Sequence, residues 1–271
     1  MRFRPCIDIH NGKVKQIVGS SLKDAGSEAV DNFVSERGAD KYAELYKAHG
    51  LRGGHVIILN PAGSEHYEAD LAQARLALSA YEGGLQIGGG ITDGNAKSFL
   101  DMGASHVIVT SFVFRGGAID FDRLERLVSA VGRERLVLDL SCKKRGGGYF
   151  IVTDRWQKFT DVPLCAETME RLSAYCAEFL VHAADAEGKQ NGIERGAAEI
   201  LRDSPIPCTY AGGIASFADV DLLGQIGGGR IDFTIGSALD LFGGKLSFAQ
   251  AAAYCGSPRG AAPGPAGGDP F

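Results

Sequence analysis

Short apolar runs rich in Val and Ile alternate along this chain with longer segments whose apolar residues recur every three or four positions. That alternation is typical of βαβ units, in which buried parallel strands are linked by amphipathic helices. The pattern predicts strands at residues 5–10, 55–59, 85–88, 106–110, 135–140, 179–184, 207–211 and 232–235. Strands of this number in a chain of 271 residues favour an α/β fold closed into a (β/α)8 TIM barrel.

The segments between the strands predict helices at residues 40–49, 69–81, 96–102, 121–130, 166–176 and 217–223. Residues 20–38 are polar and too long for an ordinary βα connection, so we expect an active-site lid there. Residues 146–161 predict an extra hairpin with its turn at Asp154-Arg155. We expect a single barrel domain over residues 1–255, followed by a disordered Gly- and Pro-rich tail at 256–271.

Similar residues recur at the end of a strand and of the fourth strand after it along the chain. The first and fifth strands end at Asp8 and Asp139, the third and seventh at Gly89-Gly90 and Gly212-Gly213, and the fourth and eighth at Thr110-Ser111 and Gly236-Ser237. This recurrence predicts a barrel built from two half-barrel repeats. Such a barrel has a site with pseudo-twofold symmetry.

The paired glycines indicate phosphate binding. A Gly-Gly pair at the carboxyl end of a strand lets backbone N–H groups approach an anion, and the positive end of the next helix dipole adds to the attraction. For one such pair a tight turn is the more common explanation. Because the pair occurs in both halves of the chain, we expect a small-molecule substrate with two phosphates.

The two aspartates are the candidates for chemistry. Asp8 and Asp139 each end a strand whose other residues are mostly apolar, so both carboxylates should face the open end of the barrel. Two carboxylates on opposite sides of a substrate can act as general base and general acid. A lone aspartate at a strand end could equally cap a helix or brace a loop. Trp156, the only tryptophan, could cover a core edge or stack on a planar substrate ring.

Composition narrows the functional class. A net charge of −5 argues against nucleic-acid binding, and no apolar stretch approaches the length needed to span a membrane. The six cysteines are scattered without C-x-x-C pairs, and the chain starts directly with a strand, so a cytoplasmic location is expected. His10, His55, His106 and His182 lack metal-ligand spacing and are interpreted as core or hydrogen-bonding residues. No dinucleotide or P-loop motif is present, and we expect neither metal nor cofactor.

Several short stretches carry a resemblance to a known family. They are Cys6-Ile-Asp-Ile-His-Asn-Gly-Lys-Val, Gln86-Ile-Gly-Gly-Gly-Ile, Val137-Leu-Asp-Leu, Trp156-Gln, His182-Ala-Ala-Asp-Ala-Glu-Gly, Ala211-Gly-Gly-Ile and Ile235-Gly-Ser-Ala-Leu-Asp. In their order and spacing over residues 5–243, these stretches resemble the phosphoribosylformimino-5-aminoimidazole carboxamide ribotide isomerases of histidine biosynthesis, in particular their eukaryotic-type branch.

The resemblance implies an Amadori rearrangement, in which a phosphorylated aminoaldose becomes an aminoketose without metal or cofactor. It implies that Asp8 is the base at C2, that Asp139 protonates the ring oxygen, and that Trp156 stacks on the substrate. A monomer is expected. The chain departs from the family pattern at Asn60, at Thr110-Ser111 and at Ala183, where the family usually has Asp, Gly-Thr and Thr. Asp185 or Ser141 could replace the hydrogen bond of that Thr.

Two alternatives are open at this stage. The sister cyclase of the same pathway, a subunit of imidazole glycerol phosphate synthase, shares the half-barrel repeat, both phosphate cradles and both aspartates, but it needs ammonia from a glutaminase. The hairpin that carries Trp156 favours the isomerase. The second alternative is a catalytically silent phosphate-binding barrel, in which the departures from the family pattern would be decay.

Overall fold

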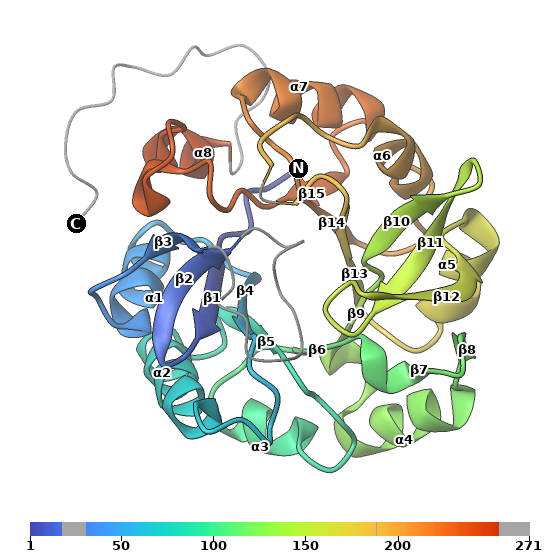
Figure 1. The fold of residues 1–271 in the computed structure, drawn as a ribbon, viewed down its shortest axis with the longest axis horizontal. Coiled ribbons are helices and arrows are strands. Elements are labelled where there is room, and N and C mark those ends of the chain that lie inside the picture. Colours follow the sequence, from blue (N-terminus) through green and yellow to red (C-terminus); the bar gives the residue numbers. More distant parts are fainter. Residues whose placement is uncertain (18–30, 188, 255–271) are drawn as a thin grey trace.

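A ring of eight parallel strands forms the centre of the molecule, and helices surround it (Figure 1). The computed structural model describes residues 1–17, 31–187 and 189–254. The parallel strands are β1 (Cys6–His10), β4 (Gly54–Ile58), β5 (Leu85–Gly88), β6 (Val107–Val109), β9 (Leu136–Asp139), β13 (Glu178–His182), β14 (Cys208–Ala211) and β15 (Ile231–Phe233). The helices are α1 (Ala39–Ala48), α2 (Tyr67–Ala80), α3 (Ala96–Asp101), α4 (Phe121–Val131), α5 (Ala166–Ser173), α6 (Arg195–Leu201), α7 (Phe217–Ile226) and α8 (Phe248–Ala253).

The sheet closes on itself between its first and last parallel strands. Neighbouring strands follow the order β15-β14-β13-β9-β6-β5-β4-β1. The segment before β1 then pairs with β15, because the Arg4 N–H donates to the Phe233 carbonyl at 2.8 Å and the Phe233 N–H donates to the Arg2 carbonyl at 3.0 Å. A parallel bridge joins Phe3 to Phe233. These bonds make the sheet a (β/α)8 barrel, as the sequence predicts.

Strand periodicity places every second side chain inside the barrel. A small inner cluster consists of Ile57, Ile108, Val137, Leu180 and Ala211. The larger core lies between the sheet and the helices, and includes the fully buried rings of Tyr42, Tyr46, Phe179 and Phe233. Asp139 and His182 follow Val137 and Leu180 of the inner cluster at a spacing of two residues, and Asp8 lines the same cavity from β1. They therefore face the carboxyl end of the same interior.

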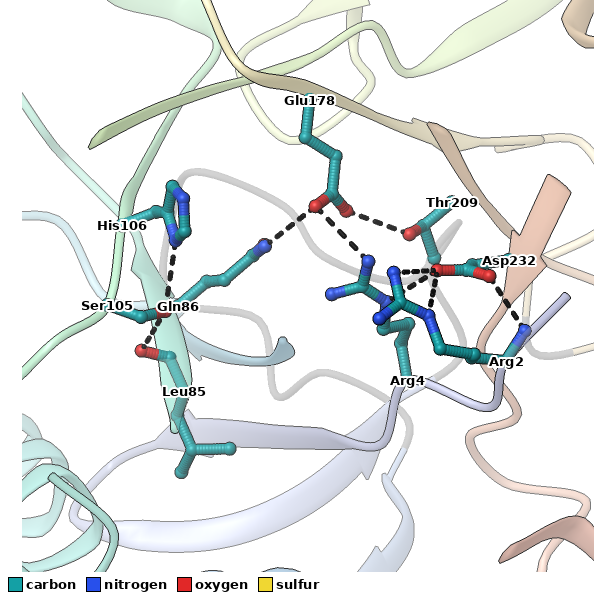
Figure 2. Close-up of polar contacts among 9 residues, drawn as sticks. All are labelled: Arg2, Arg4, Leu85, Gln86, Ser105, His106, Glu178, Thr209 and Asp232. Carbon is teal, nitrogen blue, oxygen red and sulfur yellow. Dashed lines mark hydrogen bonds and ion pairs between the residues drawn. The ribbon is translucent and has the colours of Figure 1, made fainter. Parts of the chain in front are cut away.

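Buried charges occupy the opposite end of the interior (Figure 2). The Arg4 guanidinium lies 2.8 Å from Asp232 and 3.4 Å from Glu178, and all three side chains are about nine-tenths buried. Thr209 and Gln86 donate further hydrogen bonds to Glu178. Each buried charge has a partner, which offsets the cost of its burial. The network closes the floor of the barrel and links the segment before β1 to β15.

An antiparallel extension of the sheet was not predicted. β2 (Lys13–Ile17) pairs with β1, and β3 (Asp31–Val34) pairs with β2. Asn11 and Gly12 join β1 to β2 with φ of 52° and 72°, which is the left-handed geometry that Asn-Gly hairpin turns require. Part of the lid expected at residues 20–38 therefore forms strand β3. Residues 18–30 lie outside the described residues.

A second, three-stranded sheet follows β9, where the sequence predicts an extra hairpin. It consists of β10 (Cys142–Arg145), β11 (Gly148–Thr153) and β12 (Lys158–Pro163), in that order. The turn between β11 and β12 includes Asp154 and Arg155, as expected. A short ribbon of β7 (Phe114–Arg115) and β8 (Ala118–Ile119) precedes α4.

The prediction of strands and helices from periodicity is otherwise close. Every parallel strand lies within two residues of its predicted position, whereas α6 and α8 were not predicted. The expected tail at residues 256–271 lies outside the described residues, and the domain boundary stays a prediction. Within residues 1–17, 31–187 and 189–254, the helices are too short or too polar to cross a bilayer.

Candidate active site

A cavity of about 670 Å³ opens at the carboxyl ends of the parallel strands. The residues that the sequence singles out all line it: Asp8, Gly89, Gly90, Thr110, Ser111, Asp139, Trp156, Gly212, Gly213, Gly236 and Ser237. The fold explains this convergence, because the carboxyl ends of the strands in a parallel barrel share one rim. Their roles in binding and catalysis stay predictions.

The two Gly-Gly turns have nearly the same backbone conformation. Gly89 and Gly212 have φ of 106° and 111°, and Gly90 and Gly213 have φ of 66° and 77°. Other residue types rarely adopt these angles. A Cβ atom at Gly89 would lie 2.1 Å from the Ile58 carbonyl oxygen, whereas one at Gly90 would meet no atom within 4 Å. Gly90 therefore borders open space, as expected where a ligand approaches the backbone.

The fourth and eighth strand ends differ from each other in detail. The Ser111 hydroxyl accepts a 3.0 Å hydrogen bond from the Asp154 backbone, which attaches the β11–β12 turn to the rim. On the other side, the Ser237 carbonyl accepts a hydrogen bond from Gln190. Gly236 lies against the Gln16 side chain, which a Cβ atom at this position would overlap. Thr110-Ser111 and Gly236-Ser237 thus contact different neighbouring residues in the cavity wall.

Asp8 is the carboxylate with the weaker acidity. Its Oδ2 accepts a 3.0 Å hydrogen bond from Gln16 Nε2, which the β1–β2 hairpin places beside it. Burial and the negative charge of Glu187 raise the pKa of Asp8 to about 7, against the attraction of His182 and the bond from Gln16. Near neutral pH, Asp8 can therefore both accept and release a proton.

Asp139 is held as a carboxylate. Its Oδ1 accepts hydrogen bonds from the Ser141 N–H at 2.8 Å and the Ser141 hydroxyl at 2.6 Å. Its Oδ2 lies 3.3 Å from His182 Nδ1. Burial acts to raise the pKa of Asp139, but the positive charge of His182 in the ion pair and the hydrogen bonds from Ser141 outweigh it, and the pKa falls below its ordinary value.

His182 is the functional candidate that sequence reasoning missed. It lines the cavity instead of filling the core. Burial acts to lower its pKa, but the carboxylates of Asp139, Glu187 and Asp8 raise it to about 9. His55, whose ring centroid is 5.9 Å from that of His182, has its pKa lowered to about 3 by burial and by the charge of His182. Hence His182 is cationic at neutral pH and His55 is neutral.

Glu187 and Gln16 were also missed. Glu187 lines the cavity, and burial raises its pKa. Gln16 is buried on β2, so the Asn11-Gly12 turn signal could have placed it near Asp8. For His182 and Glu187 the available signal was their position, since His182 lies near the end of the strand predicted at residues 179–184 and Glu187 lies three residues after it.

Trp156 lies in the cavity wall, as a stacking residue would. Its ring centroid is 5.6 Å from that of His182, and its Nε1 donates to the Ser141 hydroxyl at 2.9 Å. Asp154, Arg155 and Trp156 all have left-handed φ, between 52° and 65°. Consecutive non-glycine residues in this conformation store strain, which tends to occur at ligand-binding turns. Trp156 also lies outside the hydrophobic core, so the core-edge interpretation has no support.

The departures from the family pattern have local explanations. Asn60 accepts the Asn11 N–H at 2.8 Å and donates to the Asn11 side chain, so it braces the β1–β2 turn. Ala183 is buried and bridges to Cys142. Two residues were suggested to replace the hydroxyl of the Thr that the family usually has at position 183. Ser141 contacts Asp139 and Trp156, whereas Asp185 is exposed and accepts a hydrogen bond from the Lys144 N–H.

Besides His182, two basic residues of the β11–β12 hairpin line the cavity. They are Arg155 in the turn and Lys158 at the start of β12, and Lys158 pairs with Asp154 at 2.8 Å. Among residues 1–17, 31–187 and 189–254, His, Cys, Asp and Glu side chains do not gather in groups of three or more that could hold a metal ion.

The raised pKa of Asp8 predicts a pH-dependent stability cost. The pKa of Asp8 rises on folding from its ordinary value of 3.8 to about 7. Binding of this proton therefore contributes fully to the free energy of unfolding below about pH 4, and the contribution is lost as the pH rises through about 7. Asp8→Asn lacks this loss. We expect the variant to gain on the order of 4 kcal/mol over the wild type between about pH 4 and about pH 8, measured by urea unfolding at both values. An equal difference at both pH values would contradict the buried, perturbed carboxylate.

Comparison with known proteins agrees with this geometry. The sequence model described as histidine biosynthesis protein matches residues 2–246. A relative from Medicago truncatula, named as chloroplastic 1-(5-phosphoribosyl)-5-((5-phosphoribosylamino)methylideneamino)imidazole-4-carboxamide isomerase, is 53% identical over 94% of this chain and 81% of its own length. Isomerases of the same name from Neurospora crassa and Saccharomyces cerevisiae are 44% and 42% identical, each over 90% of this chain and 94% of their own length. The chain therefore belongs to the histidine biosynthesis protein family.

Proposed function

We propose that this chain is the isomerase that converts the phosphoribosylformimino aminoimidazole carboxamide ribotide aminoaldose into its aminoketose in histidine biosynthesis. The observation that carries the proposal is the position of Asp8 and Asp139 in one cavity, between two Gly-Gly turns of matching conformation. Relatives named as this isomerase, at 42–53% identity across most of the chain, support the same assignment.

In this proposal the two Gly-Gly turns hold the two phosphates of the substrate. Gly90 borders open space. Gly213, on the opposite half of the sheet order, has a similar backbone but packs against the Gly192 carbonyl, where a Cβ atom would lie 2.2 Å from its oxygen. Phosphates held at both ends would suspend the ribose over the middle of the cavity, where the two carboxylates project. The half-barrel repeat is part of this proposal, and the matching φ values support it.

The chemistry is an Amadori rearrangement. Asp139 protonates the ring oxygen, the C1–O bond breaks, and the electron pair of the amino nitrogen forms the C1=N bond of a Schiff base. Asp8 then removes the proton at C2, which the Schiff base makes acidic. Proton transfer by positioned carboxylates contributes roughly 10²–10⁴-fold to a rate. Trp156 stacks on the substrate and shields the cavity from water.

Two features favour the isomerase over the sister cyclase. Trp156 lines the cavity on the extra hairpin, and the relatives reported above are named as isomerases. The absence of a cofactor, a monomeric state and a cytoplasmic location remain predictions from the sequence, and the Medicago relative is chloroplastic by name.

A direct assay tests the function. The purified chain, supplied with the aminoaldose but with neither ammonia nor a glutaminase, should form the aminoketose, and Asp139→Asn should reduce kcat by at least about 100-fold. Tight binding without turnover would support the silent barrel. Consumption of the aminoketose only when ammonia is added would support the cyclase.

The cradle is tested by a matched pair of glycine variants. Gly90→Ala adds a methyl group to the space that the phosphate would occupy, so KM should rise at least about tenfold. Gly50→Ala is the control, because Gly50 has φ of 65° against 66° at Gly90 and also meets no atom within 4 Å, but does not line the cavity. Both variants carry the same backbone strain. A KM that rises equally in both, or in neither, would remove the cradle at Gly90.

A further inference from the structure

The site contains a mismatch between acidity and proposed role. The proposed acid, Asp139, has a pKa below its ordinary value and is ionised at neutral pH, so it lacks the proton that it must deliver. The nearest cationic group is the imidazolium of His182, whose Nδ1 forms an ion pair with Asp139 Oδ2 at 3.3 Å and has no hydrogen-bond partner among the described residues. Both side chains are about nine-tenths buried, so bulk water has limited access to the pair.

Hydrogen bonding directs the proton to one oxygen of Asp139. Oδ1 already accepts two hydrogen bonds from Ser141. The Ser141 hydroxyl cannot take up a proton in exchange, because its hydrogen points to Asp139 and its oxygen accepts the bond from Trp156 Nε1. Oδ2 is therefore the oxygen that a proton can occupy, and it is the one that faces His182.

From this geometry, and on the basis of the proposed function, we infer that His182 stores the proton that Asp139 delivers to the substrate ring oxygen. The acid of the reaction is then the Asp139–His182 pair. His182 acts through Asp139 and is a positioning residue in this account, since no contact between its ring and the reacting atoms is required.

The proton transfers balance over one turnover. A proton moves from His182 Nδ1 to Asp139 Oδ2 and on to the ring oxygen, and it leaves His182 neutral. Asp8 then takes the proton from C2. Asp8 returns a proton to C1 while O2 releases its proton to solvent, which completes the ketone and leaves the enzyme one proton short at His182. Exchange with solvent restores the starting state, and no oxidant or reductant is involved.

The groups that face His182 come from several elements. Asp139 lies on β9, Asp8 on β1 and Glu187 on the turn after β13, and the three carboxylates favour the cation. His55 on β4 is neutral, and the Trp156 ring lies at 5.6 Å. This environment predicts that the rate falls on the alkaline side as His182 loses its proton at about pH 9, and on the acidic side as Asp8 gains one at about pH 7.

The test is the pH profile of kcat/KM for His182→Gln against the wild type. Gln can donate a hydrogen bond to Asp139 but cannot store a proton, so the alkaline limb should move from about 9 to the pKa of Asp139 itself, which is a shift of at least about two pH units. The optimum should fall below about pH 7, and kcat/KM at about pH 8 should drop at least about 100-fold. His55→Gln is the control, and its alkaline limb should stay at the wild-type pH.

An unmoved alkaline limb in His182→Gln, whatever the rate, would overturn the inference. If this variant does not fold, ¹⁵N NMR of the wild-type protein decides the question: the His182 ring should titrate near pH 9 and shift to lower pH in Asp139→Asn. A His182 ring that is neutral at pH 7 would overturn the inference. Failure of the proposed function is distinct, since the wild-type enzyme would then show no turnover at any pH.

Discussion

The hydrogen bonds between the segment before β1 and β15 are the constraint on which the rest of the structure depends. Without the pairing of Arg2 and Arg4 with Phe233, the sheet would be open, with an unpaired edge at β15 and the β1–β2–β3 extension at its other end. Closure creates an interior, and strand periodicity then divides that interior into a charged floor, an apolar middle and a reactive rim. The carboxylates meet because their strands, β1 and β9, belong to one closed ring.

The rim differs from the floor in how its charges are balanced. At the floor, the Arg4 cation lies between Glu178 and Asp232, and each carboxylate has further partners. At the rim, the His182 cation faces Asp139, Asp8 and Glu187, so negative groups outnumber it. Burial and the neighbouring Glu187 carboxylate raise the pKa of Asp8, whereas the close contact with His182 lowers that of Asp139. One histidine thus separates the acidities of two aspartates that the sequence presents as equivalent.

Local patterns were sufficient to predict the barrel and many of the residues at its rim. The twofold period of the strands and the turn residues at their ends are local signals, and they place Asp8, Asp139 and both Gly-Gly pairs. The short, small-residue helices α6 and α8 lack a clear apolar stripe, and they were missed. The β1–β2 hairpin had a usable signal in Asn11-Gly12. The pairing of His182 with Asp139 joins residues far apart in the sequence, so periodicity could not reveal it.

The central claim is the division of labour between Asp8 and Asp139, and solvent deuterium exchange into the aminoketose tests it most directly. The aminoketose is already open-chain, so its reverse enolisation needs the base but not the ring-opening acid. In this step the base that transfers protons between C2 and C1 removes a proton from C1, which is where deuterium enters the aminoketose. Incubated with the product in deuterated water and followed by NMR, Asp139→Asn should retain much of the wild-type exchange, and Asp8→Asn should lose it by roughly 10²–10⁴-fold. Exchange retained in Asp8→Asn and lost in Asp139→Asn would reverse the roles and contradict the account.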